Sequence, residues 1–186
     1  AKALKDSIDF YHANMALNYI NIAENIFKQN NSTLNLGFLY TNRGFEHFRQ
    51  GDIDSAKNDF QLSIDLLKDI RFYELSYPLN NMAACYMNDD NYERAISYII
   101  QARLHNKSDY VDAVLKTQLM MCYCMLEKYN DAKNIAEELI KYIQKHHITD
   151  PTMLRKIYVN IDDTGLGGGV TDRLKEVKKE QQLYRL

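Results

Sequence analysis

The sequence has no tryptophan, and it contains only two prolines and seven glycines in 186 residues. So little glycine and proline excludes a collagen-like chain and a proline-rich disordered one. The three cysteines are odd in number and too few for a disulfide framework, which favours a reducing, cytoplasmic setting. The longest uninterrupted apolar run, residues 119–126, is far too short to span a membrane.

Charge of either sign is also not in excess, because 23 Lys and Arg residues stand against 25 Asp and Glu residues, a net charge of −2. No overall field therefore draws the chain to nucleic acid or to an anionic membrane, and we expect neither as a partner. No secretory signal stands at the start. Because the sequence begins at Ala1 with a pattern that is already helical, we expect a fragment of a larger protein.

Apolar residues recur with the 3.6-residue period of helices along the whole chain, and clean strand alternation is absent, which predicts an all-α protein. Three stretches share one layout, with anchoring alanines at Ala56, Ala95 and Ala132, separated by 39 and 37 residues. A step of 40 residues back from Ala56 reaches Ala16, and a step of 38 residues forward from Ala132 reaches Val170. We predict one repeat domain whose units are residues 1–35 (partial), 36–74, 75–111, 112–149 and 150–186 (degenerate and capping).

The layout resembles the tetratricopeptide repeat (TPR) family, whose signature is W-x2-L-G-x2-Y, then A-x3-F, then a proline. In residues 37–68, Gly44 matches the small residue of the first helix, Ala56 and Phe60 match the pair in the second, and residues 51–52 match the turn. His47 stands where an aromatic residue is usual, and the spacing exceeds the common value of about 34 residues. The resemblance implies a right-handed α–α superhelix of about four to five antiparallel helix pairs.

Stacking explains this pattern, because a lone helical hairpin cannot bury its apolar face. Small side chains are expected where the two axes of a pair cross closely; they are Gly44, Ala56, Ala83, Ala95 and Ala132. In the third unit Met120 replaces the small residue. We predict N-caps at Asp54, Asn91 and Asn130, proline in a first turn at Pro78, and a cap followed by proline at residues 150–151.

Candidate chemistry is sparse. The glycine-rich segment 165–169 lacks the preceding strand of a phosphate loop and is interpreted as an interhelix turn, with an anion site as the alternative. Cys122 and Cys124 point in different directions on a helix, so we interpret them, with Cys85, as buried apolar residues.

Residues 146–147 (His-His) suit a helix C-terminus, and the acidic pairs 89–90 and 162–163 suit turns. The basic stretch 173–185 is interpreted as the solvated face of a capping helix, with a nucleic-acid patch as the alternative. We therefore predict no enzyme, no cofactor and no metal.

The first helix of each pair is expected to line a concave groove. Asn42, Asn81 and Gln118 occupy equivalent places and form a predicted carboxamide ladder, whose amides can donate to and accept from a peptide backbone. Phenylalanine and methionine beside them are adaptable apolar contacts, although such a stripe is also typical of a core, and asparagine there can link helices. The predicted groove residues are Asn42, Phe45, Arg49, Asn81, Met87, Asn88, Gln118, Met121 and Met125.

These observations predict a non-enzymatic module that binds a protein, as a peptide or helix, in its groove. We expect it to be the sensor or scaffold part of a larger, bacterial regulatory or signalling protein. The alternative is a structural array that packs in cis or self-associates. An enzyme or nucleotide binder centred on residues 165–169 is a third hypothesis, and the oligomeric state stays open.

Overall fold

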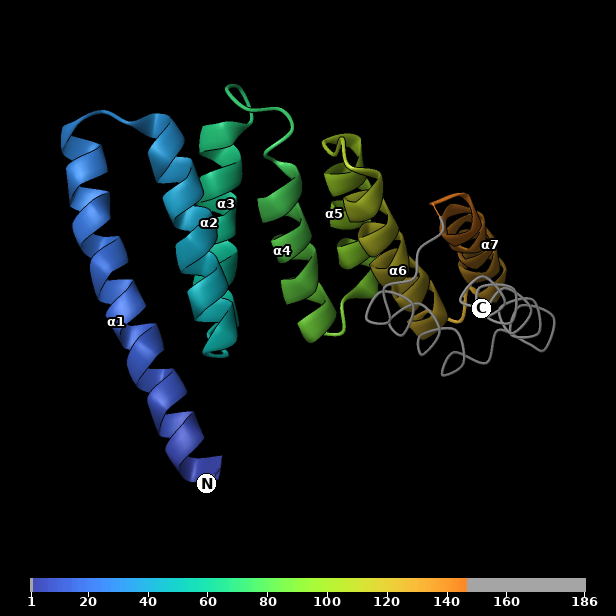
Figure 1. Cartoon of the computed structure of the whole chain (residues 1–186), viewed down its shortest axis with the longest axis horizontal. Coiled ribbons are helices and arrows are strands. Elements are labelled where there is room, and N and C mark those ends of the chain that lie inside the picture. Colours follow the sequence, from blue (N-terminus) through green and yellow to red (C-terminus); the bar gives the residue numbers. More distant parts are fainter. Residues whose placement is uncertain (1, 147–186) are drawn as a thin grey trace, which may run out of the picture. The chain divides into compact units, whose positions relative to one another are not determined.

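The computed structural model describes the backbone of residues 2–146 and the side chains of residues 15–146. The regular secondary structure of residues 2–146 consists of helices joined by turns and short loops and includes no strand, which confirms the all-α prediction there. The helices are α1 (Lys2–Gln29), α2 (Thr33–Arg49), α3 (Ile53–Leu67), α4 (Ser76–Asn88), α5 (Tyr92–Leu104), α6 (Asp109–Met125) and α7 (Tyr129–His146) (Figure 1). They belong to two compact units, Ala1–Asn106 and Lys107–Leu186.

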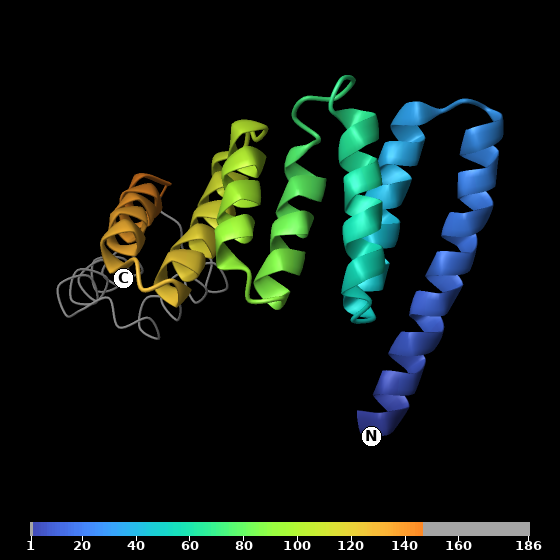
Figure 2. The same ribbon diagram turned by 180° about the vertical axis from the view of Figure 1, so that it is seen from behind.

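Helices pack in antiparallel pairs. In the first unit α2 packs on α3 and α4 on α5, while α1 packs against α2 and α3 against α4 (Figures 1 and 2). The first helices of the two pairs, α2 and α4, also contact each other. In the second unit α6 packs on α7. Each described pair therefore has the helix–turn–helix form that the repeat pattern predicts.

The turn inside each pair is three residues long and has the same geometry every time. Its middle residue has a positive φ, at 81° for Gly51, 55° for Asp90 and 57° for Glu127. The N–H of the next residue then donates to the carbonyl oxygen five residues back, at 3.0, 2.9 and 2.8 Å in the three turns. This is the Schellman ending of a helix, and it reverses the chain at the same point of every repeat.

The residue after each left-handed residue directly precedes the next helix, and this corrects two predicted caps. Asn91 is an N-cap as predicted, and its side chain accepts from the N–H of Arg94. The cap of α3 is Asp52, so Asp54 lies in the first turn. Asn130 also lies in a first turn, because α7 begins at Tyr129. The αL residue fixes both boundaries, and it leaves Asp54 and Asn130 inside the helix.

Pro78 lies in the first turn of α4, as predicted. The predicted features at residues 147, 150–151, 162–163, 165–169, 170 and 173–185 lie outside the described residues.

The anchoring alanines Ala56, Ala95 and Ala132 are all completely buried, as the repeat alignment predicts. Two residues face each other where the helices of a pair cross. From one pair to the next, a larger side chain on one helix is matched by a smaller side chain on the other. A Cβ atom on Gly44 would lie 2.7 Å from Cε1 of Phe60. The counterparts of these two residues are Ala83 with Ile99 in the second pair and Met120 with Ala136 in the third, all fully buried. Met120 is therefore accommodated because Ala136 stands where the first pair has phenylalanine.

We expect the crossing in the first pair to show this compensation as a coupling energy. Gly44→Ala overpacks the crossing and should cost about 1–3 kcal/mol of unfolding free energy, and Phe60→Ile leaves a cavity and should cost about 1–2 kcal/mol. The double variant copies the Ala83 and Ile99 pair, so its cost should be at least about 1 kcal/mol smaller than the sum. Urea unfolding of the four proteins measures this, and additive costs would contradict it.

Candidate functional site

One face of α2 carries the predicted groove residues of the first pair. Asn42 and Arg49 are exposed, and Phe45 is 48% exposed. Arg49 forms an ion pair with Glu46 at 3.1 Å. Phe38, one turn before Asn42, is 38% exposed and lies on the same face, because residues four and seven apart align along a helix. The uncovered face of α2 is therefore aromatic and amide in character.

α4 repeats this arrangement. Tyr77 is 63% exposed, and Asn81 follows it by one turn as Asn42 follows Phe38. Asn81 and Met87 are half-buried, while Asn88 is exposed. Since α2 and α4 contact each other, two neighbouring helices present the same order of an aromatic residue and an amide. We call this surface the aromatic–amide face; it consists of Phe38, Asn42, Phe45, Tyr77 and Asn81.

Phe38 and Tyr77 are missing from the sequence-based groove. The signal for them is in the sequence, because an aromatic residue stands four positions before both Asn42 and Asn81. The stretches that anchor the repeat alignment include the amide positions, whereas the equivalent aromatic positions lie outside them.

The other predicted groove residues lie on α6, in the second unit. Gln118 and Met121 are half-buried, and Met125 is 55% exposed. The Oε1 atom of Gln118 is buried and accepts no hydrogen bond. The structure thus brings Asn42 and Asn81 onto neighbouring helices, whereas the third member of the ladder stays a prediction.

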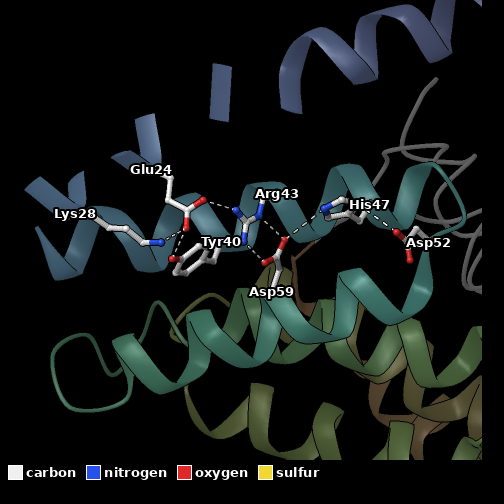
Figure 3. A network of polar contacts seen from close by, with 7 residues as sticks. All are labelled: Glu24, Lys28, Tyr40, Arg43, His47, Asp52 and Asp59. Carbon is white, nitrogen blue, oxygen red and sulfur yellow. Dashed lines mark hydrogen bonds and ion pairs between the residues drawn. The ribbon is translucent and has the colours of Figure 1, made fainter. Parts of the chain in front are cut away.

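A buried network of charges lies on another side of α2 (Figure 3). Arg43 donates to both carboxylate oxygens of Asp59, at 2.7 and 2.6 Å, and to Glu24 at 2.5 Å. The Asp59 side chain is only 6% exposed and that of Arg43 17%. The network therefore joins α1, α2 and α3 through a pair of carboxylates held by one guanidinium.

Further groups complete the network (Figure 3). Tyr40 donates a hydrogen bond to Glu24 at 2.8 Å, and Lys28 pairs with Glu24 at 2.6 Å. At the other end His47 lies between two carboxylates, 3.7 Å from Asp59 and 3.8 Å from Asp52. Every charged group in the cluster thus has a partner of opposite charge or a hydrogen bond.

These contacts shift the pKa values of the charged groups. The hydrogen bonds with Asp59 raise the pKa of the Arg43 guanidinium above its ordinary value, against the effect of burial. Burial alone would raise the pKa of Glu24, but hydrogen bonds from Lys28 and Tyr40 and the charge of Arg43 outweigh it. The net pKa of Glu24 is below its ordinary value. The network therefore stabilises the charged form of both groups.

The network stands where the other repeats have apolar contacts. In the TPR signature, Arg43 takes the position of the leucine and His47 that of the tyrosine. The counterparts of Arg43 and Asp59 are Met82 with Tyr98 in the second pair and Leu119 with Ile135 in the third. The counterpart of His47 is Tyr86, whose ring stacks on Tyr98 at a centroid distance of 5.3 Å. The first pair thus has an ion pair at positions where the other two described pairs have uncharged residues, a difference that the sequence reasoning did not detect.

A cavity of about 350 Å³ opens beside this network. Residues of α1 and α3 form its walls, and Arg43, His47 and Asp59 of the charge network also line it. Because Arg43 and Asp59 are already paired with each other, they offer no unpaired charge to a ligand. The wall residues are Leu17, Asn21, Ser55, Asn58 and Leu62.

The three cysteines are buried, as predicted, and form no disulfide. Burial raises the pKa of Cys85 to about 11 and that of Cys122 to about 12, so both are protonated at neutral pH. Within residues 15–146, no group of three or more His, Cys, Asp or Glu side chains could hold a metal ion. No helix in the described part of the chain combines the length and apolarity needed to cross a membrane.

Comparisons with known proteins identify solved structures with a similar fold. No protein-family model and no curated relative matches the sequence. Similar solved structures include BtubC (BKLC) from P. vanneervenii, with a TM-score of 0.59 and 18% identity over 79% of this chain. This chain covers 65% of the length of BtubC. They also include a Podosopora anserina putative kinesin light chain with nearly identical TPR-like repeats, at a TM-score of 0.68 and 12% identity, covering 96% of this chain and 93% of that one. These likenesses confirm the predicted fold class, an all-α array of TPR-like helix pairs.

We expect the chain to tolerate replacement of both Arg43 and Asp59 by apolar residues, but not the loss of Arg43 alone. Arg43→Leu leaves Asp59 buried without its cation and should lower the unfolding free energy by about 3 kcal/mol or more. Arg43→Leu combined with Asp59→Ile copies Leu119 and Ile135 of the third pair, and should recover most of that loss. Thermal and urea unfolding measure both variants. A double variant no more stable than the single one would show that the network itself, and not its charge balance, is needed.

Glu24 should contribute to the acid sensitivity of the fold. Its pKa is lower in the folded chain than the ordinary value of 4.5, so its stabilising effect is fully present above that pH. The effect is lost as the pH falls through the folded pKa. Glu24→Gln should therefore be less stable than the unmodified chain at pH 7, and the difference should shrink below about pH 4.5. Urea unfolding between pH 3 and 7 tests this; a difference that stays constant would contradict it.

Proposed function

We propose that this TPR-like helical-repeat chain is a non-enzymatic protein-interaction module that binds a peptide segment along α2 and α4. The proposal rests on one observation, the repeated order of an exposed aromatic residue and an asparagine on these two contacting helices. The order occurs as Phe38 with Asn42 and as Tyr77 with Asn81. A repeat array that grips an extended chain needs equivalent contacts at successive repeats, and this face supplies two of them.

The chemistry of the aromatic–amide face suits a peptide backbone. Each asparagine offers donors and an acceptor, which match the N–H and C=O groups of an extended chain. Phe38, Phe45 and Tyr77 supply apolar contact area beside these amides, with exposed fractions of 38, 48 and 63%. The five side chains carry no charge, so we infer that the bound segment is apolar or neutral where it meets α2 and α4.

The wider role is part of the same proposal. We assign the chain to the sensor or scaffold part of a larger protein, because TPR-like folds serve other chains and domains as binding platforms. Three buried cysteines that form no disulfide support a cytoplasmic location, where thiols stay reduced.

A second candidate function, self-association, is favoured by a different surface. One side of α1 carries four exposed, large apolar side chains. This surface is separate from the aromatic–amide face, because the latter belongs to α2 and α4.

Peptide selection tests the binding proposal directly. Random 15-residue peptides displayed on phage are selected on the chain, and the affinity of the recovered peptides is measured by fluorescence anisotropy. We expect Asn42→Ala combined with Asn81→Ala to weaken binding by about 10- to 30-fold, because each lost hydrogen bond is worth about 1 kcal/mol. Phe38→Ala combined with Tyr77→Ala should weaken it at least as much.

The matched control is Asn58→Ala, since Asn58 is an exposed amide on α3 that lines the cavity beside the charge network. This variant should bind the peptides like the unmodified chain. All variants must melt within a few degrees of it, as measured by circular dichroism. Peptides that bind both double variants with unchanged affinity, or that lose binding only in Asn58→Ala, would refute the aromatic–amide face as the binding site.

A further inference from the structure

α1 has an apolar face that the described side chains of the first unit leave exposed. Tyr19 is 66% exposed, Ile22 57%, Ile26 48% and Met15 36%. α1 lies at the edge of this unit, with α2 on one side only (Figures 1 and 2). Four large apolar side chains along one helix form a continuous strip, whereas isolated exposed apolar residues are common on protein surfaces.

The spacing of the strip is that of a coiled-coil seam. Its members are separated by four, three and four residues, which is the alternation of d and a positions in a heptad repeat. With Tyr19 and Ile26 at a positions, Met15 and Ile22 take d positions. Glu24, which joins α1 to Arg43, then takes the f position on the opposite side of the helix. α1 is therefore anchored by one side and presents the seam on the other.

The residues beside the seam carry no charge. The e positions hold Ala16 and Ala23, and the g positions hold the exposed Asn18 and Asn25. Between Met15 and Ala23 the sequence has no charged residue at all. An identical helix can therefore approach without the repulsion between like charges that usually separates copies of one chain.

We propose that this seam binds the same seam of a second copy, with the two α1 helices antiparallel. A two-fold axis midway between Tyr19 and Ile22 places Tyr19 opposite Ile22 of the second copy, and Met15 opposite Ile26 of the second copy. The same axis places Asn18 opposite Asn25 and Ala16 opposite Ala23 of the second copy. Apolar, amide and small residues thus each meet their own kind, as a self-complementary two-fold contact requires.

The area predicts a weak dimer. An aromatic or large aliphatic side chain buries roughly 200 Å², so four that are about half exposed supply roughly 400 Å² per copy. Standard stable interfaces bury about 800 Å² per partner. The pairing is therefore expected to be reversible and in the micromolar range, with a monomer at low concentration.

Sedimentation equilibrium of the whole chain from about 2 to about 500 μM is the first test, a range that brackets a micromolar dissociation constant. We expect the average mass to rise from that of a monomer toward that of a dimer. Ile22→Lys should raise the dissociation constant at least 20-fold, while Ile100→Lys, at an apolar residue of α5 with 43% exposure, should leave it unchanged. A monomer over the whole range, or an equal effect of both substitutions, would overturn the proposal.

Charges at the g positions give a second test that leaves the seam intact. Asn18→Glu with Asn25→Glu places like charges across the axis and should weaken the dimer about 10-fold at low salt. Asn18→Glu with Asn25→Lys places opposite charges there and should strengthen it several-fold. Both positions are exposed, so the fold should be kept. If the two variants behave alike, the proposed pairing is wrong.

Cross-linking fixes the direction of the helices. Mixed samples of Tyr19→Cys and Ile22→Cys should form a disulfide between copies, and Ile22→Cys alone should form it poorly, since the native thiols are buried. Efficient cross-linking of Ile22→Cys with itself would show a parallel pair and overturn the antiparallel one. Ile22→Lys should still bind the phage-selected peptides, because the aromatic–amide face does not include Ile22. The dimer proposal and the peptide-binding proposal can therefore fail independently.

Discussion

The close crossing of the two helices in each pair is the constraint on which the rest of the structure depends. A hairpin of two helices buries its apolar side only if the helices approach closely and neighbouring pairs cover what remains. At the crossing, Gly44 meets Phe60, and the same positions hold Ala83 with Ile99 and Met120 with Ala136. The combined size of the two side chains varies less from pair to pair than either residue does. This explains how the third pair tolerates a large residue in the first helix without losing the fold.

The turn within each pair shows how far the sequence predicts local structure. Gly51 indicates its own left-handed conformation, because glycine adopts it without cost. Asp90 and Glu127 adopt the same conformation. Aspartate is more common there than most residues other than glycine, but the residue type of Glu127 does not indicate it. The position of that residue decides which side chain caps the next helix. The repeats are therefore predictable from periodicity, whereas the caps predicted at Asp54 and Asn130 fall inside the helices that they were expected to precede.

The candidate sites also differ in how far the sequence predicts them. Asn42 and Asn81 could be found because equivalent positions in two repeats hold the same residue type. Arg43 and Asp59 could not, since each looks like an ordinary surface residue in the sequence, and only their contact shows that they replace an apolar pair together. They are sixteen positions apart in the sequence, on either side of the turn between α2 and α3. A compensating change across two helices is visible in single sequences only when the repeats are aligned at every position, apolar ones included.

The charge network also accounts for the unusual character of α1. Its alanines Ala16 and Ala23 are half-buried, whereas the anchoring alanine of α3, Ala56, is fully buried. Apolar packing alone therefore holds α1 less firmly than it holds the helices within the pairs. The ion pairs of Glu24 supply a directional attachment, because a largely buried carboxylate is stabilised only where its partners are held in place. A helix fixed in this way can keep a second apolar side uncovered, and this is the physical reason why one helix can belong to the array and still offer a seam to another chain.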